Sequence, residues 1–145
     1  MPTHFSTDTD IERIGTGLID RSLPKRDWTH AGHFAAALWL LRHRGDVFVA
    51  SELPALIRAY HEATGVANTD AGGYHETITR ASIRAARSVL DGHAENTALH
   101  VLANGLLASE LGRSDWLLHY WSRARLFSIE ARRLWVEPDL RSLPF

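Results

Sequence analysis

The chain has 145 residues, of which 45% are hydrophobic and 23% are charged, and its formal net charge is -1. A chain of this length can bury one hydrophobic core without disulfides or a structural metal, which predicts a single domain over residues 1–145. The near-zero net charge provides no basic surface for nucleic acid or an anionic membrane, so we expect neither as a partner. The absence of cysteine excludes disulfides, thiolate metal ligands and cysteine nucleophiles.

The sequence has none of the patterns that mark a membrane span or a secretion signal. No apolar run approaches the roughly 20 residues that cross a bilayer. The first residues, MPTHFSTDTD, lack the basic and apolar regions of a signal peptide. We therefore expect a cytoplasmic protein without membrane contact.

Helix-length segments separated by glycine and proline account for most of the chain. The predicted helices are residues 6–24, 29–43, 51–65, 73–92, 95–109, 114–125 and a short one after Ser128. The fifth is apolar nearly all round, which predicts a central buried helix. Strand patterns are almost absent, and DVFVA at residues 46–50 is too short and isolated to form a sheet. The sequence therefore predicts an all-α fold, a single-domain bundle of six to seven helices.

The nine histidines are the richest chemical feature of this cysteine-free chain. On a helical wheel, His30 falls inside the apolar stripe of the second predicted helix, and His33 lies about 60° to one side. His75 falls near the centre of the inward face of the fourth. The first turn of a helix favours the neutral imidazole ring, the form that binds a metal ion. We therefore predict that His30, His33 and His75 are the ligands of an open site for Zn²⁺, Fe²⁺ or Mn²⁺.

The surroundings of His75 support a second kind of site. Thr79 and Ser82 lie about one turn beyond it on the same side, which predicts a polar and roomy part of the interior. Tyr60 faces inward from the third predicted helix. Glu76 lies about 100° from His75 and is more simply explained as the i,i+4 partner of Arg80.

Two further side chains have two alternative explanations each. Arg123 is predicted to lie close to the inner face formed by Trp116 and Tyr120, where a guanidinium needs a partner. That partner is either an internal carboxylate or carbonyl, or the carboxylate or phosphate of a substrate. Trp39 lies opposite the main apolar stripe of its helix, so it packs on another helix or belongs to a homodimer interface.

Three functional hypotheses follow, because a single inward histidine more often satisfies a core hydrogen bond and HxxH spacing occurs by chance. The first is a metal-dependent or histidine-assisted enzyme that acts on a small molecule, with His61 and Tyr120 as its catalytic residues. The second is a metal-free module that binds a small anionic ligand. Its predicted ligand-binding residues are Arg123, Tyr60, Thr79 and Ser82. The third is a homo-oligomeric structural protein whose histidines only complete hydrogen bonds in the core.

Three sequence blocks carry a resemblance that covers most of residues 27–140: DWTHAGH, NTDAGGYHETIT and SRARLFSIEARRLWVEPDL. They resemble the shared blocks of a family of small bacterial helical proteins with no assigned activity. The resemblance implies a common helical unit. It implies no reaction, cofactor or catalytic residue, so the histidine argument depends on the residues alone.

Overall fold

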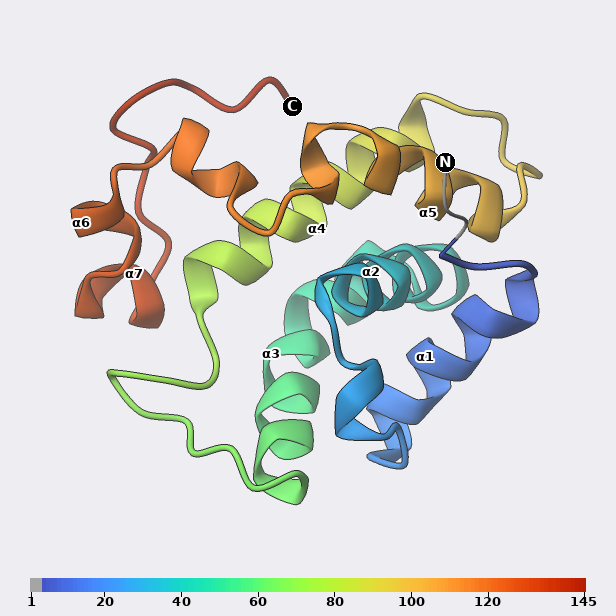
Figure 1. Ribbon diagram of the computed structural model, residues 1–145, viewed down its shortest axis with the longest axis horizontal. Helices are drawn as coiled ribbons and strands as arrows, with labels where there is room; N and C mark the ends of the chain where they lie inside the picture. Colours follow the sequence, from blue (N-terminus) through green and yellow to red (C-terminus); the bar gives the residue numbers. More distant parts are fainter. Residues whose placement is uncertain (1–3) are drawn as a thin grey trace.

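The computed structural model describes residues 4–145, and its regular secondary structure over this range is helical (Figure 1). The α-helices are α1 (Asp8–Asp20), α2 (His30–Arg44), α3 (Asp46–Ala63), α4 (Glu76–Asp91), α5 (Leu99–Ala108), α6 (Arg123–Leu126) and α7 (Ile129–Arg133). The short 3-10 helices are η1 (Lys25–Asp27), η2 (Glu110–Gly112) and η3 (Trp116–His119). The predicted all-α bundle of six to seven helices is confirmed. Within residues 4–145, no helix has both the length and the apolar character needed to cross a membrane.

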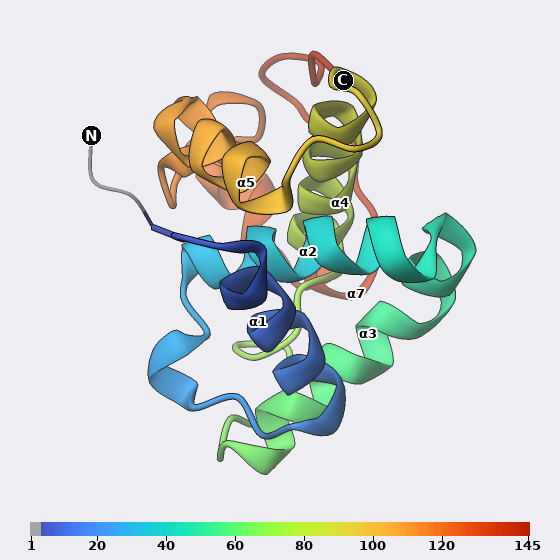
Figure 2. The same ribbon diagram turned by 90° about the vertical axis from the view of Figure 1, so that its right-hand side faces the viewer.

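Helix α2 is the centre of the bundle. In Figure 2 it runs across the middle of the molecule, with α4 and α5 on one side and α1 and α3 on the other, and it packs against all four. Every residue from Phe34 to Leu41 is buried. The prediction that the fifth helix is central is wrong, because α5 leaves Val101 54% exposed. The run of three alanines that ends at Ala37 lets neighbouring helices approach α2 closely from several directions.

The ends of α2 agree with the capping pattern of the sequence. The Thr29 side chain accepts a hydrogen bond from the backbone N–H of Gly32, and Gly45 ends the helix with a φ of 87°. The predicted start of the next helix at Ser51 is wrong, because α3 begins at Asp46 directly after the same glycine. One residue in the left-handed region therefore turns the corner between two helices, and no linker is needed.

The predicted helix over residues 114–125 is broken into η3 and α6. Asp139 accepts hydrogen bonds from the Ser122 backbone N–H at 2.7 Å and from its hydroxyl at 2.6 Å, and Ser122 caps α6. This interruption changes the direction of the residues that follow. Arg123 is exposed, and its guanidinium lies 5.5 Å from the ring centre of Phe127, the C-cap residue of α6. The predicted inner-face position of Arg123 is therefore wrong.

Trp39 packs on another helix, which decides between the two explanations for it. The side chain is 6% exposed, and its ring lies so close to α1 that a Cβ atom on Gly15 would come within 2.5 Å of it. Gly15 is therefore required for the packing of α1 against α2.

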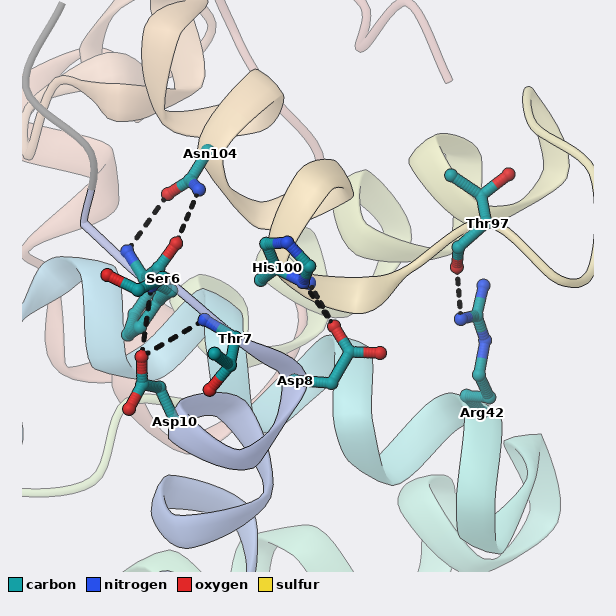
Figure 3. A network of polar contacts seen from close by, with 9 residues as sticks. Ser6, Thr7, Asp8, Asp10, Arg42, Thr97, His100 and Asn104 are labelled. Atoms are coloured by element: carbon teal, nitrogen blue, oxygen red, sulfur yellow. Dashed lines mark hydrogen bonds and ion pairs between the residues drawn. The ribbon is translucent and has the colours of Figure 1, made fainter.

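Residues 4–8 are bound along α5 (Figure 3). The Asn104 side chain accepts hydrogen bonds from the backbone N–H groups of His4 and Phe5 and donates one to the Phe5 carbonyl at 2.8 Å. The Asp8 carboxylate accepts from the backbone N–H of His100 at 2.9 Å and lies 2.6 Å from its Nδ1. These contacts hold Phe5 in the core, where it is 7% exposed.

Candidate ligand-binding groove

Helices α3 and α4 diverge from one another in Figure 1, and two adjoining cavities lie between them. We call these the outer and inner cavities of the α3–α4 groove. They share the α4 residues Thr79 and Ile83 as a common wall. The outer cavity has a volume of about 310 Å³ and the inner one about 50 Å³. The inner cavity lies against α2, and it also opens to solvent beside the exposed residue His33.

The inner cavity has apolar walls and a few polar groups. Its apolar walls include Ala36, Ala37, Leu53, Ile57 and Ile78. The remaining lining comes from Trp28, His33, Ser82 and the shared wall. Mostly apolar cavities with a few convergent polar groups are typical of small-molecule sites. Two predicted ligand-binding residues, Thr79 and Ser82, and one predicted metal ligand, His33, therefore lie at the same cavity.

The His33 ring has a defined tautomer. Its Nδ1 lies 2.6 Å from the Thr29 carbonyl oxygen. A carbonyl oxygen only accepts hydrogen bonds, so Nδ1 carries the proton and the neutral ring has a lone pair on Nε2. No hydrogen bond to any of residues 4–145 uses that lone pair. The ring also stacks on Trp28, with 3.8 Å between the ring centres, which fixes its orientation.

The position of His33 favours the neutral ring. Burial among densely packed protein atoms lowers its pKa from 6.5 to about 4; the Thr29 carbonyl opposes this, and the positive forms of His30 and His61 add to it. His33 is nevertheless one of the exposed residues of α2, and this contact with water weakens the effect of burial on its pKa. The pKa of His33 is still lowered from its usual value, so the ring is uncharged at neutral pH.

The free energy of unfolding is expected to fall by about 1 kcal/mol through His33 as the pH falls from 6.5 towards 4. The unfolded chain takes up a proton on this histidine over that range, whereas the folded ring does not until the lower pKa is reached. The full contribution is therefore present above pH 6.5 and is lost as the pH falls. Urea unfolding at a series of pH values, with the His33→Gln variant beside the parent, measures it. Identical pH profiles for the two proteins would contradict the prediction.

The hydroxyl groups of Thr79 and Ser82 differ from others in the helices. The hydroxyls of Thr16, Ser51 and Ser88 each donate to a backbone carbonyl three or four residues earlier at 2.8 to 2.9 Å. Neither Thr79 nor Ser82 returns its hydroxyl to a carbonyl of α4, and Ser82 has no side-chain hydrogen bond within residues 4–145. The Thr79 hydroxyl lies near that of Tyr74. The Ser82 hydroxyl is therefore available to a molecule in the inner cavity.

The charged groups of the outer cavity differ in how far they are already paired. The Tyr74 hydroxyl donates to Glu76 at 2.6 Å, and burial together with this carboxylate raises the pKa of Tyr74. The predicted pairing of Glu76 with Arg80 is wrong, because the Arg80 guanidinium lies instead over the ring of Trp135, at 5.4 Å. Arg84 lies over the same ring at 5.6 Å.

His75 is the N-cap of α4 and is buried. Its Nδ1 accepts the backbone N–H of Ile78 at 3.1 Å, and its Nε2 donates to the Leu126 carbonyl at 2.7 Å. Both ring nitrogens are occupied, so no lone pair is free for a metal ion. Burial lowers the pKa of His75, which keeps this neutral tautomer in place.

The three predicted metal ligands serve separate backbone hydrogen bonds. His30 Nε2 lies 2.7 Å from the Leu111 carbonyl, whereas the His33 and His75 rings face the carbonyls of Thr29 and Leu126. Within residues 4–145, no group of three or more His, Cys, Asp or Glu side chains could hold a metal ion. The structure therefore does not bring these rings together as a ligand set.

Three other predicted site residues have internal partners. Tyr60 is fully buried, as predicted, and its hydroxyl donates to the Leu23 carbonyl at 2.9 Å. His61 lies 2.9 Å from Asn68 Oδ1, which also accepts from a backbone N–H, so His61 Nδ1 is the donor. The Tyr120 hydroxyl donates to Glu110 at 2.5 Å, which raises the pKa of Tyr120. None of the three lines the groove.

Sequence reasoning missed Trp28 and Arg80 as groove residues. The position of Trp28 could have been predicted from a local pattern in the sequence. Trp28 immediately precedes the N-cap Thr29, and His33 is the fourth residue of the helix, the two positions that meet in a hydrophobic staple. Arg80 had no such signal, because its free position depends on Trp135, which is distant in the sequence.

No family model, curated protein or solved structure gives a match to this chain. The resemblance to small bacterial helical proteins therefore stays a prediction. The functional argument depends on the groove itself.

Proposed function

We propose that this protein binds a small organic molecule in the α3–α4 groove without a metal ion, in the bacterial cytoplasm. One observation carries the proposal. The lone pair of His33 Nε2 and the hydroxyl of Ser82 have no partner within residues 4–145, and both side chains line the same apolar cavity. His33 is exposed and Ser82 is partly buried, so water can satisfy both groups in the free protein, and a ligand with a polar atom in this cavity can replace that water.

The energetics of the inner cavity favour exchange of water for a ligand. Water that fills the cavity in the free protein can hydrogen-bond to His33 and Ser82 but loses contact with other water along the apolar walls. A ligand with a polar atom near these two side chains keeps the hydrogen bonds and buries apolar surface as well. The outer cavity, at about 310 Å³, reaches the lower end of the volumes usual for ligand sites.

The other two hypotheses have less support from the geometry. A metal-dependent enzyme would need converging ligands, whereas His30 and His75 bond to carbonyls on different elements. For a structural oligomer, Trp39, the side chain considered for its interface, is inside the chain, whereas the apolar side chains that remain exposed near the C-terminus include Phe127, Ile129 and Leu134. The metal-free binding module is the hypothesis that gives a role to His33 Nε2 and to the Ser82 hydroxyl, which have no partner within residues 4–145.

The proposal is tested by filling the inner cavity. Ligand-observed NMR with isocaproate, isohexanol and isohexylamine covers one carbon skeleton with three different head groups. We expect at least one to bind the parent protein, and Ser82→Leu to weaken that binding by about tenfold or more because the larger side chain occupies the cavity.

The matched control is Ser51→Leu, the same change at an exposed position of α3 outside the groove. It should leave binding unchanged. The proposal is wrong if none of the three compounds binds the parent, or if Ser82→Leu and Ser51→Leu bind equally well while both remain folded by circular dichroism.

A further inference from the structure

We infer that the ligand is a small amphipathic anion, with a carboxylate or phosphate held by Arg80 in the outer cavity and a short apolar arm in the inner cavity. This inference depends on the proposed function, since it names the ligand class of the same groove. Two features carry it: the free N–H groups of Arg80 in the outer cavity and the neutrality of the inner cavity.

The carboxylates of the outer cavity already have partners. Glu76 accepts the Tyr74 hydroxyl at 2.6 Å, and Asp46 pairs with Arg87 at 2.7 Å. The negative charge of Asp46 is therefore compensated by a cation, whereas Glu76 keeps its charge, because the Tyr74 hydroxyl holds one of its oxygens without neutralising it. A cation entering the groove would compete with these internal contacts.

Arg80 is the group of the outer cavity whose polar atoms remain free. Its guanidinium stacks on Trp135 at 5.4 Å and makes no hydrogen bond or ion pair with any of residues 4–145. Stacking uses the face of the guanidinium and leaves the N–H groups at its edge available. Two of these N–H groups match the two oxygens of a carboxylate or phosphate. Arg84 lies over the same ring, and one of its nitrogens donates to the main-chain oxygen of Phe145 at 2.6 Å.

Further cations lie just behind the walls. Arg58 lies 4.3 Å from the ring centre of Tyr74, and Arg87 holds Asp46 from outside the cavity. Further carboxylates lie there too: Asp91 pairs with Arg87 at 3.1 Å, and Glu137 accepts from Trp135 Nε1 at 2.9 Å, so the charges around the outer cavity nearly balance. The selection of an anion therefore depends on the free N–H groups of Arg80 and not on an excess of positive charge around the cavity.

The inner cavity selects an uncharged arm. Its walls are apolar, and the small side chains Ala36 and Ala37 leave a space of about 50 Å³. His33 contributes a lone pair but no charge, and Ser82 contributes a hydroxyl. A charged group would lose its hydration there without an opposite charge to replace it. An aliphatic arm of a few carbons fits this environment, and a hydroxyl on it could meet His33 or Ser82.

The experiment compares head groups on one arm. Isocaproate, isohexyl phosphate, isohexanol and isohexylamine share the same branched carbon skeleton, and isothermal titration gives their Kd values. We expect either anion to bind at least about tenfold more tightly than isohexanol, and isohexylamine to bind most weakly. The comparison of the first two compounds decides between a carboxylate and a phosphate head group. Inorganic phosphate and acetate, which lack the arm, should bind at least about tenfold more weakly than the two arm-bearing anions.

Arg80→Gln should remove the preference for the anions and leave the affinity for isohexanol unchanged. The matched control is Arg123→Gln, an exposed arginine outside the groove, which should change neither value. The inference is overturned if isohexanol or isohexylamine binds the parent as tightly as the anions, or if acetate or inorganic phosphate does. It is also overturned if Arg80→Gln keeps the preference. In each of these cases binding itself is still observed, so the proposed function survives; if no compound binds, both fail.

Discussion

Replacing Gly73 with alanine is expected to lower the free energy of unfolding by about 3 kcal/mol. Gly73 has a φ of 80°, a conformation that costs an alanine about 1 kcal/mol or more. A Cβ atom there would also lie 2.5 Å from the Ala67 carbonyl oxygen and 2.8 Å from the Asn68 Cα. Both neighbours are backbone atoms, so relief requires movement of the connection between α3 and α4. Urea unfolding monitored by tryptophan fluorescence measures the change.

The neighbouring glycine provides a matched control. A Cβ atom on Gly72 would meet no heavy atom within 4 Å, and its φ is not in the left-handed region. Gly72→Ala is therefore expected to change the stability by less than about 0.5 kcal/mol. Gly73→Ala should also weaken ligand binding, because the connection positions Tyr74 at the outer cavity. Equal stability of the two variants would show that the turn does not need its positive φ.

His75→Ala is expected to destabilise the protein by about 3 kcal/mol, from three losses that act together. The first turn of α4 loses its N-cap, because Ile78 N–H has no other acceptor. The Leu126 carbonyl loses its donor at a buried position. The missing ring leaves a cavity between α4 and the C-terminal helices. Urea unfolding again gives the value, with circular dichroism to confirm that the variant folds.

His75→Asn separates these losses. Asparagine is a good N-cap, so it can accept from Ile78 N–H, but its side chain is too short to replace the bond to Leu126. We expect a loss about half that of His75→Ala. Metal analysis of protein purified without an affinity tag distinguishes the other role predicted for this residue. Stoichiometric metal in the parent that disappears in His75→Ala would contradict an N-cap role with both nitrogens on the backbone.

The capping residues explain why most of the helices could be predicted. Thr29 and Ser128 start α2 and α7, and Gly45 ends α2, as their local preferences indicate. The start of α3 could not be predicted in this way. Gly45 serves two helices at once, and whether a glycine ends a helix or joins two depends on where the second helix packs.

The groove could be predicted in part. Helical spacing placed Thr79 and Ser82 on one inward side, and both line the inner cavity. The same reasoning was wrong for Arg123, because it assumed one continuous helix. Asp139, which is distant in the sequence, holds Ser122 and starts a new helix there.

The sequence by itself determined the all-α class, most of the helix ends and the inward side of α4, because capping and helical spacing depend on residues within one or two turns. Only the tertiary structure decided which histidine meets which group. His30, His33 and His75 each lie near a helix start, but the acceptors of His30 and His75 belong to η2 and α6, far away in the sequence. The distance between two side chains depends on how their helices cross, and spacing within a helix contains no information on that. For this reason His33 alone of the three lines the groove, together with Trp28 and Ser82.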